Sequence, residues 1–80
     1  MLDKKTYLSM KRYIKCMCRS HVKTLCENME LDDFEKSLVM RFYDGEKVEK
    51  TCIDLGISQP TYTVCLKTVM SKINDYKNTN

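Results

Sequence analysis

The sequence predicts a small all-α domain of four helices, with a long N-terminal helix and a helix-turn-helix at the C-terminal end. Apolar residues recur every three or four positions through most of the 80 residues, which is the spacing of a buried helical stripe. Only two Gly and one Pro interrupt the pattern, and each stands where a helix would end or begin. A chain of this length forms one domain, residues 1–80, whose small core would gain stability from dimerisation.

The first predicted helix covers residues 1–27, with Asp3 or Thr6 as its N-cap. Residues 1–26 carry seven Lys or Arg and one Asp, a balance of +6, whereas residues 27–50 have a balance of −4. The basic face is either a solvated surface or one that meets nucleic acid. A place on a membrane surface fits less well, because the core needs the apolar stripe of this helix. That stripe contains Tyr7, Met10, Ile14, Met17, His21 and Leu25, widened by Cys18 and Val22.

The second helix is predicted to begin at a capping box formed by Asp32 and Glu35, and to end at the turn Asp44-Gly45. Its core stripe contains Phe34, Leu38, Val39 and Phe42. The third helix is predicted over residues 46–55 with the stripe Val48, Cys52, Ile53 and Leu55.

A tight turn is predicted between the third helix and the fourth. Gly56 can take the left-handed conformation that ends a helix. Ser58 is a good N-cap, and Pro60 lies in the first helical turn, where its missing N–H costs nothing. The fourth helix covers residues 59–76, and its buried stripe contains Tyr62, Cys65, Leu66, Val69, Met70 and Ile73. Two helices joined by a short turn with Gly form the unit that places a recognition helix in the major groove.

The five cysteines are expected to be free thiols, because their number is odd and the first residues lack the apolar region of a signal peptide. We therefore expect a cytoplasmic protein. No apolar run is long enough to span a bilayer, so no membrane partner is expected. On a continuous first helix, Cys16 and Cys18 would point to nearly opposite sides and could not share a zinc ion with His21 or Cys26. We expect no metal and no cofactor.

No catalytic constellation is recognisable in the chain. His21 has no nucleophile partner in a strand-turn-helix elbow, and no phosphate-binding Gly-rich loop is present. The acidic residues of the middle third are explained by helix caps and a solvated face. We therefore do not expect an enzyme.

Residues 31–73 resemble region 4 of bacterial sigma-70 factors and the similar LuxR-type module, and the similar part extends to about residue 76. The matching elements are Arg41-Phe42-Tyr43, Asp44-Gly45, Cys52 as a small residue, Leu55-Gly56-Ile57-Ser58, and Thr61. The resemblance implies that helix 59–75 is a major-groove recognition helix. It further implies that DNA is contacted by Ser58, Gln59, Thr61, Thr63, Val64 and Lys67. The other domain of a sigma factor is absent from these 80 residues, and Pro60, Thr63 and Val64 stand where the family often has charged residues.

The function expected from this pattern is a DNA-binding transcriptional regulator that acts on double-stranded DNA. A single helix-turn-helix domain usually needs a second copy for specificity, so a homodimer is expected. The apolar stripe of the first helix is the candidate dimer interface if the core of the domain does not use it. The alternative is a protein-interaction module that acts on RNA polymerase, a sigma factor or another protein, favoured by the apolar Val64. A narrower alternative is DNA packaging by a phage-type terminase small subunit, since the size and composition suit a phage or other mobile element.

Overall fold

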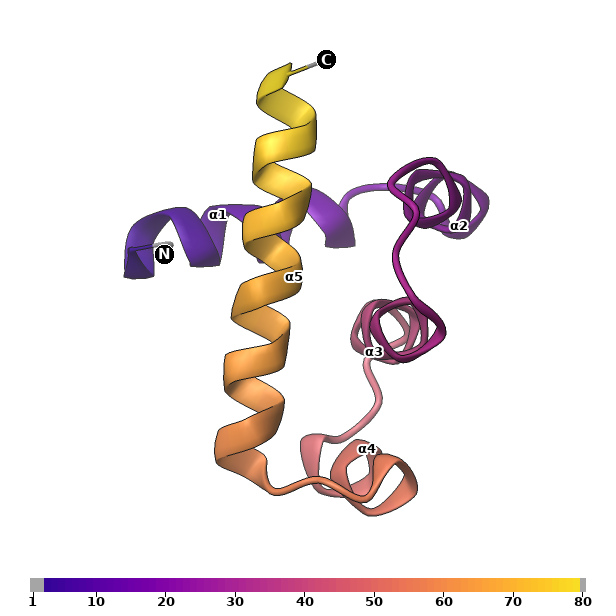
Figure 1. Cartoon of the computed structure of the whole chain (residues 1–80), viewed down its shortest axis with the longest axis vertical. Helices are drawn as coiled ribbons and strands as arrows, with labels where there is room; N and C mark the ends of the chain where they lie inside the picture. The colour runs from indigo at the N-terminus through magenta and orange to yellow at the C-terminus, as the bar shows by residue number, and fades with distance from the viewer. Residues whose placement is uncertain (1–2, 80) are drawn as a thin grey trace.

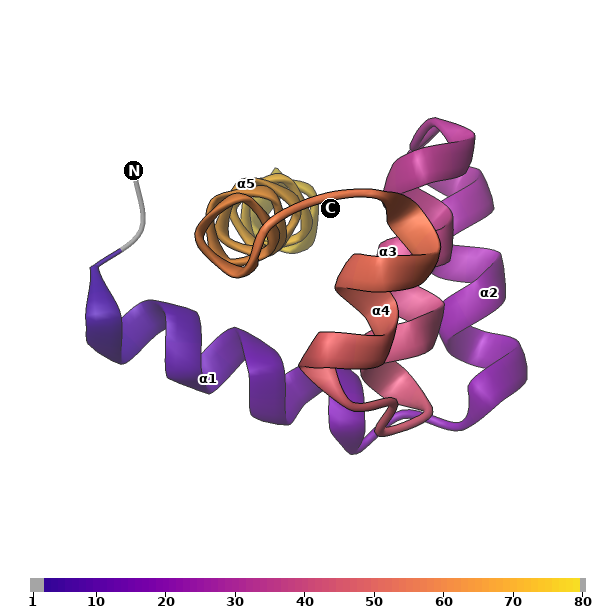
Figure 2. The ribbon, with the colours of Figure 1, turned by 90° about the horizontal axis from the view of Figure 1, so that it is seen from below.

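The computed structural model describes residues 3–79, which form five α-helices and no strand. The longest helix, α5 (Gln59–Thr79), is crossed by α1 (Lys4–Lys15). The helices α2 (Arg19–Asn28), α3 (Asp33–Tyr43) and α4 (Val48–Leu55) stack along one side of α5 (Figure 1). Seen along α5, α1 lies below it and α3 and α4 lie to its right (Figure 2). The prediction of an all-α chain is confirmed, but five helices replace the expected four.

The single long helix expected over residues 1–27 is wrong, because the chain breaks at residues 16–18. Cys18 is extended, with φ −76° and ψ 156°, and becomes the N-cap of α2. Residues at the end of α3 hold the break in place. The Tyr43 hydroxyl donates to the Met17 carbonyl, and Asp44 pairs with Arg19. The bend lets α1 pack on α5 while α2 packs on α3.

The core lies where α5 meets the other helices. Its completely buried side chains are large and apolar and come from α1, α2, α3 and α5: Ile14, Val22, Leu38, Val39, Leu66, Val69, Met70 and Ile73. The predicted stripe of the fourth helix is confirmed, except that Cys65 is only half-buried. Met10 and Ile14 of the first helix are buried in this core, so the core uses that part of the stripe.

Several predicted core positions face outward instead. His21 is exposed, and so are Phe34, Val48 and Ile53. In α4 the buried position next to Cys52 is taken by Thr51, which is 1% exposed. Thr51 can be buried because its hydroxyl donates to the carboxylate of Glu46, 2.8 Å away.

The ends of α3 show how the sequence sets its boundaries. The Asp32 carboxylate accepts from the Glu35 N–H at 2.7 Å, and Glu35 completes the predicted capping box. After α3, Arg41 reaches forward to two carboxylates, at 2.6 Å from Glu46 and 2.9 Å from Asp54. Arg41 thereby fixes the start and the end of α4 relative to α3.

Candidate nucleic-acid interface

The turn between α4 and α5 has the predicted local structure. Gly56 is left-handed, with φ 68° and ψ 37°, and the Ile57 N–H donates to the Cys52 carbonyl at 2.9 Å. The Ser58 hydroxyl accepts from the Thr61 N–H at 3.3 Å and also hydrogen-bonds to the Thr61 hydroxyl at 2.9 Å. Ser58 therefore caps α5, and the beginning of α5 is held in a defined position relative to α4.

The beginning of α5 presents mostly exposed side chains. Five of the six residues predicted to contact DNA are exposed: Ser58, Gln59, Thr61, Thr63 and Val64. Lys67 is half-buried. Tyr62 is 6% exposed, as predicted for a residue that packs inward. The beginning of α5 is therefore covered on the Tyr62 side and exposed at the other positions.

The six residues do not share one face of the helix. Gln59, Thr63 and Lys67 are spaced by four and follow one edge of α5. Val64 lies on the outermost side and is 61% exposed, whereas Ser58 and Thr61 are hydrogen-bonded to each other at the turn. The Thr63 hydroxyl donates to the Gln59 carbonyl at 3.3 Å, so its oxygen is left to accept a hydrogen bond and its methyl group to make apolar contacts.

The edge that carries Gln59 and Thr63 forms one wall of a groove of about 640 Å³. The groove is open between α1, α5 and the beginning of α4, and aromatic rings form much of its lining. Its lining residues are Tyr7, Lys11, Lys15, Phe42, Gly45, Glu46, Val48, Glu49, Gln59, Tyr62, Thr63 and Leu66. The groove therefore has a basic wall on α1 and an acidic end at α4.

The basic wall of the groove is built from lysines placed over aromatic rings. The Lys11 ammonium lies 5.1 Å from the centre of the Tyr7 ring and 5.6 Å from that of Phe42. The Lys15 ammonium lies 4.8 Å from the Phe42 ring centre, and Lys67 of α5 lies 5.6 Å from the Tyr7 ring centre. A row of ammonium groups and rings thus connects α1 to the edge of α5.

The two tyrosines of the groove remain neutral phenols. Burial raises the pKa of Tyr62 above its usual value. Burial also raises the pKa of Tyr7, and the nearby Tyr62 adds to that effect. Both hydroxyls therefore keep their protons and can donate hydrogen bonds at neutral pH.

Four of the fourteen Lys and Arg residues form ion pairs among residues 3–79, and those without an ion pair include Lys23, Lys36, Lys47, Lys67 and Lys77 as well as the cations of α1. Arg19, Arg41, Lys50 and Lys72 form ion pairs with carboxylates. Among residues 3–79, no carboxylate lies within ion-pair distance of the five cations of α1: Lys4, Lys5, Lys11, Arg12 and Lys15. The α1 helix itself contains no acidic residue, so its positive charge is not neutralised locally.

Sequence reasoning missed Tyr7 and Phe42 as parts of this surface. Tyr7 was assigned only to the core stripe, yet it is half-buried and has two ammonium groups against its ring. The spacing of four between Tyr7 and Lys11 is a signal that could have indicated one such contact. The contact with Lys67 depends on tertiary packing and has no local signal.

No group of three or more His, Cys, Asp or Glu side chains among residues 3–79 could hold a metal ion. The five cysteines are free thiols, as predicted. None of the described helices has the length and apolarity needed to cross a bilayer.

Comparison of the chain with protein-family models, curated proteins and solved structures finds no match. The resemblance of residues 31–73 to sigma-70 region 4 therefore rests on the residues alone and stays a prediction.

Proposed function

We propose that this chain binds double-stranded DNA through the beginning of α5, as a helix-turn-helix transcriptional regulator similar to sigma region 4. The observation that carries the proposal is the exposed edge of α5 beside the cations of α1. Gln59 and Thr63 are exposed and lie across the groove from Lys11. Side chains of these types read base edges, and lysines contact phosphates.

The roles of the residues follow from their chemistry. The amide of Gln59 can pair with the N6 and N7 atoms of adenine, and the methyl group of Thr63 can contact the methyl group of thymine. Ser58 is suited to a phosphate through its hydroxyl, whereas in the first turn of α5 Pro60 has no N–H and the Thr61 N–H is already donated to Ser58. Two copies of the chain would read two half-sites, so we propose a homodimer on DNA.

A binding measurement with a pool of random-sequence duplexes tests the proposal. The protein should bind the pool at low salt, and its affinity should fall steeply as the salt concentration rises. Gln59→Ala should weaken binding to a preferred duplex by about 1–3 kcal/mol. Asn78→Ala, an exposed change at the far end of α5, is the matched control and should bind like the unmodified chain.

A second candidate function is a protein-interaction module for RNA polymerase, a sigma factor or another protein. It is favoured by Ile53 and Val64, which are 79% and 61% exposed on α4 and α5. Val64→Asp should abolish binding to such a partner. A chain that binds no DNA at any salt concentration would favour this second function.

A further inference from the structure

Tyr7 has two ammonium groups against its ring, and they come from different helices. The Lys11 nitrogen lies 5.1 Å from the ring centre, and the Lys67 nitrogen lies 5.6 Å from it. Neither lysine has a carboxylate within ion-pair distance among residues 3–79. The fold therefore places two like charges beside one ring without a counterion of its own.

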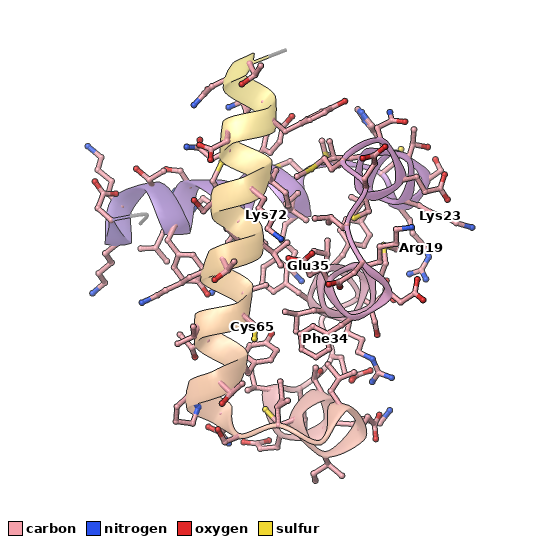
Figure 3. All side chains as sticks on the ribbon, in the orientation of Figure 1. Arg19, Lys23, Phe34, Glu35, Cys65 and Lys72 are labelled. Atoms are coloured by element: carbon pink, nitrogen blue, oxygen red, sulfur yellow. The ribbon has the colours of Figure 1, made fainter. Side chains whose placement is uncertain are left out.

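Arg41 and Lys72 at other helix contacts have carboxylate partners, whereas Lys15 and Lys77 have none within ion-pair distance among residues 3–79. Lys72 of α5 pairs with Glu35 of α3 (Figure 3) at 2.6 Å, and Arg41 lies between Glu46 and Asp54. Like charges repel each other when no anion lies near them. An anion bound beside the Tyr7 ring would supply the counterion that both ammonium groups lack among residues 3–79.

We propose that Lys11 and Lys67, placed against Tyr7, form a phosphate-binding pair for the backbone of duplex DNA. This inference rests on the proposed function. Lys67 follows Gln59 by eight residues, or about 12 Å along the helix axis. The N-terminal residues of a recognition helix contact base edges, so Lys67, about two turns further along α5, is better placed for a phosphate than for a base.

The acidic residues of the groove determine which wall the phosphate can approach. Glu46 is engaged by Arg41 and Thr51, whereas Glu49 has no cation within ion-pair distance among the described residues. Both carboxylates lie at the α4 end of the groove. A phosphate is repelled from that end, so it is expected at the α1 wall beside Tyr7.

The salt dependence of DNA binding tests the phosphate-binding pair. Lys11→Gln, Lys67→Gln and the double variant are compared with the unmodified chain on one fixed duplex over a range of KCl concentrations. Each lost phosphate contact makes the negative slope of log K against log salt shallower by about 0.9. The slope of the double variant should therefore be shallower by about 1.8. Lys67→Arg keeps the charge and should keep the slope.

A matched control is present in the same helix. Lys77 lies 4.6 Å from the ring centre of Tyr13, a similar lysine-tyrosine contact at the other end of α5. Lys77→Gln should leave the slope unchanged. Thermal unfolding followed by circular dichroism verifies that each variant is folded.

The outcomes separate this inference from the proposed function. If the unmodified chain binds no duplex DNA at low salt, the proposed function and this inference are both overturned. If it binds and the double variant keeps the full slope, only the phosphate-binding pair is overturned. An equal loss of slope in Lys77→Gln would also overturn the pair, since the effect would then follow net charge alone.

Discussion

Lys15 of α1 donates to the carbonyl of Phe42 at the end of α3, over a distance of 2.7 Å, and its ammonium group lies over the ring of the same residue. It also donates to the Tyr43 carbonyl at 3.2 Å. The Phe42 carbonyl also accepts from the Gly45 N–H at 3.1 Å, and Lys15 adds a charged donor to it and to the Tyr43 carbonyl at the negative end of the α3 dipole. This contact ties the basic helix to the middle of the domain.

Replacing Lys15 by Gln should destabilise the fold. The charged hydrogen bonds to the end of α3 are lost, at a cost of about 1 kcal/mol. Thermal unfolding should show a decrease in Tm of about 4–8 °C for a chain of this size. Lys23→Gln, which changes an exposed lysine of α2, should leave the Tm unchanged. An unchanged Tm in Lys15→Gln would contradict the role of this contact.

The carboxylate of Glu46 should make stability depend on acid pH. The Thr51 hydroxyl and the Arg41 guanidinium lower the pKa of Glu46 below 4.5. A lowered folded-state pKa means that the stabilisation is complete above pH 4.5 and is lost as the pH falls through the folded value. Urea unfolding at pH 7 and pH 3 should show Glu46→Gln less stable than the unmodified chain at pH 7. The difference should shrink at pH 3, and a difference that is equal at both pH values would contradict the assignment.

Gly56 should be the most sensitive position in the turn before α5. A Cβ atom at this position would meet no atom within 4 Å, so the cost of a side chain arises from φ 68° alone. Gly56→Ala should therefore lose about 1–2 kcal/mol of unfolding free energy. Gly56→Asn should lose less, because Asn tolerates the left-handed region. If urea unfolding shows that Gly56→Ala and Gly56→Asn lose the same unfolding free energy, the cost would not arise from the backbone conformation alone.

The cysteines should differ in reactivity. The contact with the Ser20 hydroxyl and the nearby His21 N–H lower the pKa of the exposed Cys18, whereas burial raises the pKa of Cys26. The thiolate is the reactive form, so iodoacetamide at pH 7 should alkylate Cys18 well before Cys26. Peptide mass spectrometry after brief labelling measures both rates. Faster labelling of Cys26 would contradict the burial of that side chain.

Local signals in the sequence were sufficient for the caps and for α5. The capping box at Asp32, the left-handed Gly56 and the Ser58 cap depend on neighbours within a few residues, and the structure contains all three. The buried stripe of α5 followed from a spacing of three and four. These features are local, so they can be predicted without tertiary information.

The break between α1 and α2 could not be predicted in this way. The apolar spacing continues through residues 14–22, and neither Gly nor Pro marks the bend. The bend is held by Tyr43, Asp44 and the end of α3, which lie more than twenty residues away in the chain. Tertiary contacts likewise decide that Thr51 faces inward and Ile53 outward, because Thr51 gains a hydrogen bond to Glu46.

The same limit applies to the candidate site. Periodicity placed Gln59 and Thr63 on an exposed edge of α5, and the structure agrees. The lysines that lie across from this edge come from α1, and only the packing of α1 on α5 brings Lys11 and Lys67 to the same ring. The recognition of DNA itself stays a proposal.

Selection of preferred sites from random duplex DNA with the purified chain tests DNA recognition by α5. We expect an enriched sequence motif, with a preference that Gln59→Ala relaxes at one base pair and that Asn78→Ala leaves unchanged. A pool that remains random after selection at low salt, with no retained duplex, would contradict DNA recognition by α5.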